Sequence, residues 1–209
     1  MGIHQRFAVE SYVGRSVMDG KMIEIIAYKN GWPLEFRQIA FALRQGLGPL
    51  ALRIDHIGST AVPGLAAKDV IDIQISVAAL NPELLSALES LGYSRLEDFR
   101  CDHRPARAGG ADLEWQKWFF YPPSGQRRTN THVRMQGRGN QRYALLFRDY
   151  LRAHPATAES YGELKRRLAQ NLSDLSMYAE VKDPAVDLIY LAAEEWATSS
   201  KWEPGPSDA

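Results

Sequence analysis

The chain of 209 residues contains one cysteine, Cys101. A single cysteine cannot form an internal disulfide, and this usage is typical of a reducing compartment. The first dozen residues include no apolar core of signal-peptide length, and no run approaches the roughly 20 apolar residues of a membrane-spanning helix. Internal repeats and low-complexity tracts are also absent. These absences predict a cytoplasmic protein with no membrane partner.

The formal net charge is zero, because 25 Lys and Arg residues balance 25 Asp and Glu residues. The distribution along the chain is uneven: residues 100–152 hold eleven Lys or Arg against four Asp or Glu. This basic segment suits an anionic small ligand such as a nucleotide. It lacks the interleaved aromatic and basic residues of an RNA-binding sheet, so we expect no nucleic-acid partner. The oligomeric state is left open.

The patterns that are present predict an α+β domain over residues 23–198. An N-terminal arm over 1–22 precedes it, and a disordered tail over 199–209 follows it, since the tail is rich in Pro, Gly and Ser. Asp183-Pro184 is expected either to start a helix or to kink a longer one. The other expected elements are strands at 23–28, up to 56, at 70–77, 114–121 and 130–135, and helices at 33–47, 82–91 and between 143 and 196.

Asp72 lies between Ile71 and Ile73 in the apolar strand at 70–77. An ionisable group in such a run is costly to bury unless it is paired or binds a cation. Two interpretations remain open. Asp72 either holds a metal ion, or is a structural carboxylate that accepts hydrogen bonds from the preceding Gly58-Ser59 turn.

A second polar pattern occurs in the strand at 130–135. Period-two alternation places Asn130, His132 and Arg134 on one face of this strand. That face could lie over Asp72. His132 would then serve as a general base or metal ligand and Arg134 as a phosphate clamp. The structural alternative for His132 is a hydrogen-bonded, half-buried side chain on a sheet.

The segment from His56 to Lys68 reads HIGSTAVPGLAAK. It resembles the hallmark segment of the GrpB family, a nucleotidyltransferase-like group, and the resemblance runs from about Ile23 to about Trp196. In nucleotidyltransferases a Gly-Ser pair precedes a strand that carries Asp, one apolar residue, and Asp or Glu. Here the second acidic position is Gln74, and a neutral amide is a poor ligand for Mg²⁺.

The resemblance implies a mixed β-sheet packed with helices, a helical C-terminal portion, and a phosphate-binding site. Its small residues let the backbone approach the phosphates closely, and Asp72 would be the Mg²⁺ ligand. With Gln74 in the second position, other carboxylates would have to complete the site. The catalytic candidates are Asp72, His132 and Glu114, with Asp69 and Asp102 as further carboxylates. The phosphate-binding candidates are Gly58, Ser59, Thr60, Lys68, Lys117 and Arg134, with Lys182 as a further basic residue.

Two functions follow as hypotheses. The first is Mg²⁺-dependent transfer of a nucleotidyl group from an NTP to a small acceptor. The second is a non-catalytic module that binds a nucleotide or another phosphorylated small molecule and has lost the second acid at Gln74. The sequence leaves open which of the two holds, and which nucleotide and acceptor are involved.

Overall fold

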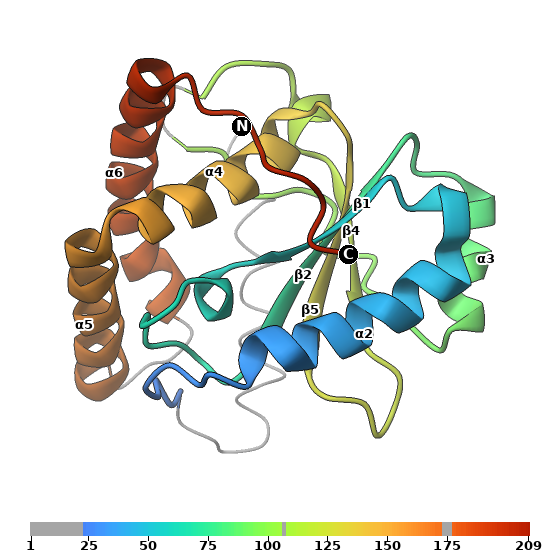
Figure 1. Ribbon diagram of the computed structural model, residues 1–209, viewed down its shortest axis with the longest axis horizontal. Helices are drawn as coiled ribbons and strands as arrows, with labels where there is room; N and C mark the ends of the chain where they lie inside the picture. Colours follow the sequence, from blue (N-terminus) through green and yellow to red (C-terminus); the bar gives the residue numbers. More distant parts are fainter. Residues whose placement is uncertain (1–22, 106–107, 173–176) are drawn as a thin grey trace.

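The computed structural model describes residues 23–105, 108–172 and 177–209. The predicted arm at 1–22 lies outside these residues. A five-stranded mixed sheet in the order β1-β2-β5-β4-β3 forms the centre of the molecule (Figure 1). β2 pairs with β5 in parallel, and the other neighbours are antiparallel. The strands are β1 (Arg53–Ile57), β2 (Ile71–Val77), β3 (Ser94–Arg95), β4 (Lys117–Tyr121) and β5 (Thr129–Met135).

Helices cover both faces of this sheet (Figure 1). α2 and α3 lie on one side, and α4, α5 and α6 lie on the other. The predicted α+β class is therefore confirmed. Pro184 lies inside α6 rather than at its start. The helices are α2 (Trp32–Leu47), α3 (Pro82–Ser90), α4 (Gly139–Ala153), α5 (Pro155–Asn171) and α6 (Met177–Ser200).

Alternation along β2 separates the core from the polar face. Ile71, Ile73 and Ile75 are fully buried and pack against α2 and α3 in the main hydrophobic core. Asp72, Gln74 and Ser76 point to the opposite face, because successive side chains of a strand alternate. Asp72 is paired with Asn130 and Gln74 with His132 across the parallel β2–β5 pair. The predicted polar face of β5 thus lies beside Asp72.

Two predicted strands differ from the structure. The segment at 23–28 makes only an isolated bridge, between Ile26 and Ala67. Glu114, expected in a strand, lies in a 3₁₀ turn, η3 (Asp112–Trp115), that precedes β4. Aromatic composition favours a strand throughout this stretch. The carboxylate of Glu114 instead accepts a hydrogen bond from the backbone N of Gly139 at 3.0 Å, which ties the turn to the start of α4.

The sequence predicts a disordered tail over 199–209, but Ser199 and Ser200 end α6 and the residues that follow run along β1 (Figure 1). The backbone N of Ala209 donates to the Ile54 carbonyl at 3.1 Å. Ser207 Oγ accepts from Ile54 N, and Asp208 Oδ2 accepts from His56 N, each at 2.9 Å. β1 is an edge strand whose outer backbone groups need partners, and the tail supplies them. Composition alone does not reveal this pairing.

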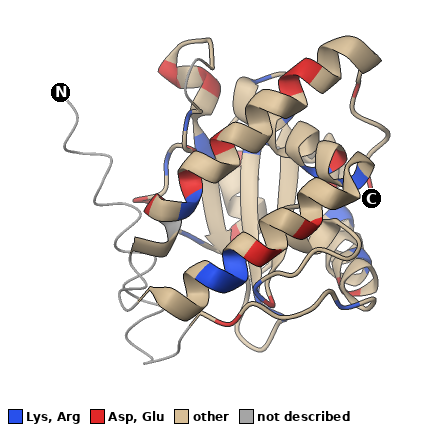
Figure 2. Cartoon of the chain, turned by 90° about the vertical axis from the view of Figure 1, so that its left-hand side faces the viewer, with Lys and Arg blue, Asp and Glu red and all other residues tan. Residues whose placement is uncertain are grey.

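Charges of both signs occur on the outside of the molecule. Figure 2 shows Asp and Glu spaced along the helices that face the viewer, with Lys and Arg among them, rather than one continuous basic surface. Some of the Lys and Arg residues in 100–152 form ion pairs inside the protein, as described below. Among the described residues, no helix has the length and apolar character required to cross a membrane.

Candidate functional site

The turn after β1 brings backbone against Asp72. Gly58 has φ of +69°, a conformation that L side chains rarely adopt, and a 3₁₀ turn over Ser59–Ala61 follows it. A Cβ at Gly58 would lie 2.3 Å from Asp72 Oδ2. Position 58 therefore favours glycine for two reasons: its backbone has a positive φ, and its Cα lies close to the Asp72 carboxylate.

Gly58→Ala is expected to lower the free energy of unfolding by about 2–5 kcal/mol. A positive φ costs about 1–2 kcal/mol for alanine, and the overlap with Asp72 adds about 1–3 kcal/mol of overpacking. Gly64→Ala is the matched control, because Gly64 has φ of +80° but no atom within 4 Å of its Cβ position. Urea unfolding of both variants checks this, and equal losses would show that the contact with Asp72 costs nothing.

Asp72 has a protein partner on the neighbouring strand. Its Oδ1 accepts a hydrogen bond from Asn130 Nδ2 at 2.8 Å. Burial raises the pKa of the Asp72 carboxyl, while the hydrogen bond from Asn130 and three nearby lysines act in the opposite direction. The lysines are Lys68, Lys182 and Lys165.

Lys165 of α5 is the most deeply placed of the three lysines. Its side chain is nearly inaccessible, with 3% exposure of the residue, and its Nζ donates to Ser59 Oγ at 2.8 Å. The ammonium also lies 4.6 Å from the centre of the Tyr161 ring. Burial and, to a smaller extent, the nearby Lys182 lower the pKa of Lys165 to about 7, with Asp72 opposing the shift. An ammonium that titrates near neutrality thus contacts the predicted phosphate-binding turn.

The other two lysines enclose the same carboxylate from different elements. Lys68 precedes β2, and its Nζ lies 4.6 Å from the centre of the Tyr178 ring. Lys182 of α6 is mostly buried, and its Nζ lies 3.9 Å from Asp183 Oδ1. Desolvation lowers the pKa of both groups, but the Lys68 side chain is exposed. Lys165 is therefore the lysine whose charge we expect to change most near neutral pH. We call Ser59, Lys68, Asp72, Lys165 and Lys182 the Asp72 cluster.

Lys165 was not among the candidates drawn from the sequence. It follows Tyr161 by four residues, on the face of α5 that also buries Ala158 and Gly162. A lysine on the buried stripe of an amphipathic helix is unusual, because Lys is almost never fully buried without a partner. That position in the helical period is the signal that could have found it.

A second group of buried charges surrounds Asp102. Its carboxylate accepts hydrogen bonds from Lys117 Nζ at 2.7 Å and from Arg134 Nε at 2.7 Å and Nη2 at 2.8 Å. Asn140 Nδ2 donates to the same carboxylate at 3.0 Å. Arg134 and Lys117 hold the pKa of Asp102 far below its usual range despite burial. We call Asp102, Lys117, Arg134 and Asn140 the Asp102 network.

The Asp102 network uses two residues that the sequence offered as phosphate ligands. Lys117 and Arg134 share the Asp102 carboxylate, and Arg134 Nη1 also donates to Gln74 Oε1 at 2.7 Å. His132 lies beside them, with its Nδ1 at 3.4 Å from Lys117 Nζ and 3.3 Å from Arg134 Nη2. Burial and these two cations keep the pKa of His132 well below its ordinary value, so the imidazole is neutral.

The remaining sequence candidates lie in hydrogen-bonded positions. Glu114 pairs with Arg138 beside the start of α4. Asp69 accepts from Lys29 at 2.7 Å and from Trp32 Nε1 at 2.8 Å. Thr60 Oγ1 lies 3.0 Å from His56 Nε2. Burial lowers the pKa of His56 to about 3, so this histidine is neutral.

The donor set around Asp72 does not fit a two-metal centre. Gln74 occupies the second acidic position, and its amide oxygen already accepts from the guanidinium of Arg134. Within the parts of the chain that the structure describes, no three His, Cys, Asp or Glu side chains gather to hold a metal ion. A Mg²⁺ ion that is bound together with phosphate groups uses one or two carboxylates of the protein, and this site contains one, Asp72.

Comparison with known proteins assigns the family. The family model described as GrpB protein matches residues 22–191. The chain belongs to the GrpB family. The crystal structure of the conserved protein GrpB from Enterococcus faecalis superposes with a TM-score of 0.63 and 30% sequence identity, covering 83% of this chain and 99% of that one.

Curated relatives of this GrpB-family chain carry two kinds of name. A dephospho-CoA kinase of Mycolicibacterium paratuberculosis is 39% identical over 189 residues, covering 83% of this chain and 46% of that protein. A UPF0157 protein of Halalkalibacterium halodurans is 32% identical over 186 residues, covering 86% of this chain and 87% of that protein. The chain thus spans about half the length of the kinase-named relatives and most of the length of the other.

Proposed function

We propose that this GrpB-family protein binds the phosphate groups of a nucleotide or another phosphorylated small molecule at the Asp72 cluster. The observation that carries the proposal is Lys165, a buried ammonium that donates to Ser59 in the turn after β1. A buried lysine whose pKa is strongly lowered is a common feature of functional sites. An anion that binds beside Lys165 would raise the pKa of its ammonium group and so favour the charged form.

The charge balance of the Asp72 cluster supports an anionic ligand. The Asp72 carboxylate favours the charged forms of all three ammonium groups. Lys182 has Asp183 as a second anion, so three positive charges face two negative ones. The turn adds the Ser59 hydroxyl and a glycine that lets the backbone approach closely. Lysines bind phosphate as point charges, so this arrangement suits phosphate groups without demanding one particular geometry.

Mg²⁺-dependent nucleotidyl transfer has less support. The nucleotidyltransferase-like resemblance favours it, and Asp72 lies where the first metal ligand is expected. The second position is Gln74, bonded to Arg134 of the Asp102 network. Of the residues predicted to assist, Arg134 belongs to that network, His132 contacts Arg134, and Glu114 pairs with Arg138. Binding without turnover therefore agrees better with the side-chain contacts.

The kinase name of some relatives does not lead to a kinase proposal for this chain. A phosphate-binding loop of the Walker type reads G-x-x-x-x-G-K followed by Ser or Thr. No such segment occurs in the 209 residues. The match also covers 46% of that relative, and a name given to a whole protein does not identify which part performs its reaction.

The affinity for pyrophosphate is expected to fall as the pH rises from 7 to 9. Below pH 7 Lys165 is charged in the free protein, because its pKa is about 7. Above pH 7 the free protein must take up a proton on binding, so the affinity falls by up to about tenfold per pH unit. Isothermal titration calorimetry with pyrophosphate measures this, and proton uptake appears as a dependence of the heat on the buffer.

Lys165→Arg is the matched variant, since a guanidinium stays charged over this whole range. The titration of pyrophosphate itself is common to both proteins and cancels in the ratio of their affinities. We expect that ratio to grow with pH in favour of the Lys165→Arg variant. A constant ratio would remove Lys165 from the binding site, and no binding by the natural protein at any pH would overturn the proposed function.

A further inference from the structure

His132 lies on β5 between the Asp72 cluster and the Asp102 network. On the same face of the strand, Asn130 precedes it and donates to Asp72, and Arg134 follows it. Two residues along a strand span about 7 Å, so the imidazole is within the length of one small ligand from Asp72. Both His132 and Asp72 are partly exposed. A ligand bound at the Asp72 cluster can therefore reach His132.

The two cations beside His132 determine which of its ring nitrogens carries the proton. Nδ1 lies 3.4 Å from Lys117 Nζ and 3.3 Å from Arg134 Nη2. A guanidinium has no acceptor, and Lys117 Nζ donates to Asp102. Nδ1 therefore presents its lone pair to these groups. Burial and the two cations keep the pKa of His132 well below its ordinary value, so the ring is neutral and its one proton is on Nε2.

Nε2 of His132 is open to a ligand. It belongs to the ring bond opposite Nδ1, so it points away from the two cations. No described residue bonds to it, and it is not among the inaccessible polar atoms that lack a partner in the described part of the chain. Phe119 packs edge-to-face against the ring, with centroids 4.9 Å apart, and limits its rotation. His132 thus offers a neutral N–H donor with a fixed direction.

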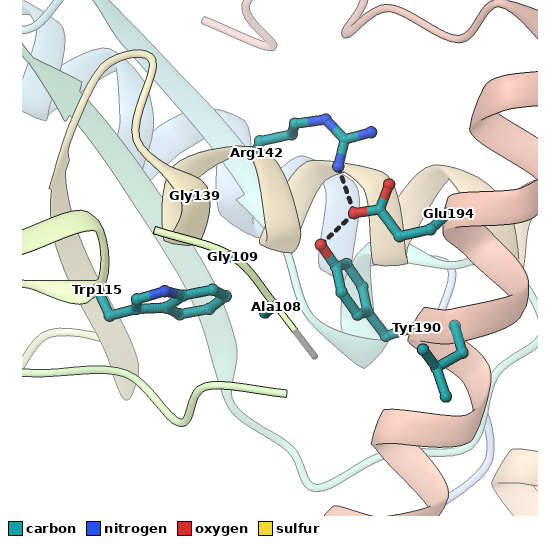
Figure 3. A pocket seen from close by; sticks show the side chains of 8 residues that line it. Ala108, Gly109, Trp115, Gly139, Arg142, Tyr190 and Glu194 are labelled. Atoms are coloured by element: carbon teal, nitrogen blue, oxygen red, sulfur yellow. Dashed lines mark hydrogen bonds and ion pairs between the residues drawn. The ribbon is translucent and has the colours of Figure 1, made fainter. Parts of the chain in front are cut away.

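The pocket between α4, α6 and the loop that precedes η3 differs in this respect (Figure 3). Its polar side chains are bonded to one another, since Glu194 accepts hydrogen bonds from Arg142 and from the Tyr190 hydroxyl. Trp115 Nε1 has no partner among the described residues, but it is inaccessible. The accessible, unpaired donor of His132 is the stronger indication of a ligand contact.

We infer that His132 donates a hydrogen bond from Nε2 to the organic part of the phosphorylated ligand, and that this part carries an uncharged acceptor such as a sugar hydroxyl or a carbonyl oxygen. The inference rests on the phosphate binding proposed for the Asp72 cluster. Phosphate oxygens bind the ammonium groups there in preference to His132, because hydrogen bonds from charged donors are about twice as strong as neutral ones. The part of the ligand that adjoins the phosphates then lies beside His132.

This role differs from the general base considered from the sequence. Nε2 holds the proton, so it has no lone pair with which to take another from a substrate, and Nδ1 faces two cations. His132 is therefore a specificity-determining residue that favours a phosphate ester over inorganic pyrophosphate.

The test compares pyrophosphate with two phosphate esters of equal phosphate number, UDP and ADP, by calorimetric titration of the full chain. His132→Phe keeps an aromatic ring but has no donor. It should weaken the binding of at least one of the esters about fivefold, the effect of one hydrogen bond, and change the affinity for pyrophosphate less than twofold. His132→Gln supplies an amide N–H on a side chain of similar length, and should recover part of the lost affinity.

NMR of the ¹⁵N-labelled chain tests the position of the proton without a ligand. The chain has five histidines, and the ring signals of His132 are those lost in His132→Phe. Long-range ¹H–¹⁵N correlations should show a proton on Nε2 alone from pH 8 to pH 6. A proton on Nδ1 at any pH in this range would overturn the inference.

The binding results separate this inference from the proposed function. Urea unfolding first establishes that both His132 variants are folded. If the natural protein binds pyrophosphate but rejects UDP and ADP, or if His132→Phe affects all three ligands equally or none of them, His132 does not recognise an organic part and only the inference fails. If the natural protein binds none of the three, the proposed function fails and the inference fails with it.

Discussion

Replacing Asp102 by alanine is expected to lower the free energy of unfolding by about 3–5 kcal/mol, the cost of removing one partner from a buried ion pair. The carboxylate accepts four hydrogen bonds, from Lys117, Arg134 and Asn140. Without it, two cations on neighbouring strands remain buried with no anion between them. Urea unfolding measures the loss.

Two further variants separate charge from packing at this position. Asp102→Asn keeps the shape of the side chain but removes its charge, and should cost most of what Asp102→Ala costs. Asp98→Ala removes an exposed carboxylate from the same loop, and should stay within about 0.5 kcal/mol. A loss below about 1 kcal/mol for both Asp102 variants would show that the network does not stabilise the fold.

Lys165→Met is expected to weaken pyrophosphate binding by about tenfold to a hundredfold at pH 7, the effect of losing a charge-assisted hydrogen bond. The same variant should not destabilise the free protein. Burying the ammonium is costly, as its lowered pKa indicates, and the methionine side chain fills similar space without a charge. Loss of affinity together with retained stability would separate a binding role from a structural one.

Arg37→Ala serves as the control for the loss of a positive charge. Arg37 is exposed on α2, and its removal should change the affinity by less than about twofold, because exposed charges at a distance are screened by salt. Calorimetry and urea unfolding of the two variants complete the comparison. If Lys165→Met binds pyrophosphate as tightly as the natural protein, the ligand does not contact Lys165.

The elements that position the site follow closely from local sequence signals. Asn81 accepts from the backbone N of Leu84 at 2.9 Å, as a cap before Pro82 requires. Asp72 lies in the strand where the apolar run predicts it, and Gly58 in a turn. These features depend on residues a few positions apart, which is why a single sequence contains the information.

Which residues come together at the site depends on contacts between distant parts of the chain, and the sequence does not reveal these contacts. Lys165 reaches Ser59 across 106 positions of the chain, and Arg134 reaches Asp102 across 32. Lys117 and Arg134 have the chemistry of phosphate ligands, but they are paired with a carboxylate from a loop. Which cation is paired internally and which remains available is decided by tertiary structure alone.

The most direct test of the central claim, that lysines rather than a metal hold the phosphate, is a calorimetric titration with pyrophosphate in the presence of EDTA. We predict saturable binding without added Mg²⁺, and its loss in Lys165→Met. The contrary result is binding that is absent in EDTA, returns with Mg²⁺ and disappears in Asp72→Asn. That result would make Asp72 a metal ligand and favour nucleotidyl transfer over simple binding.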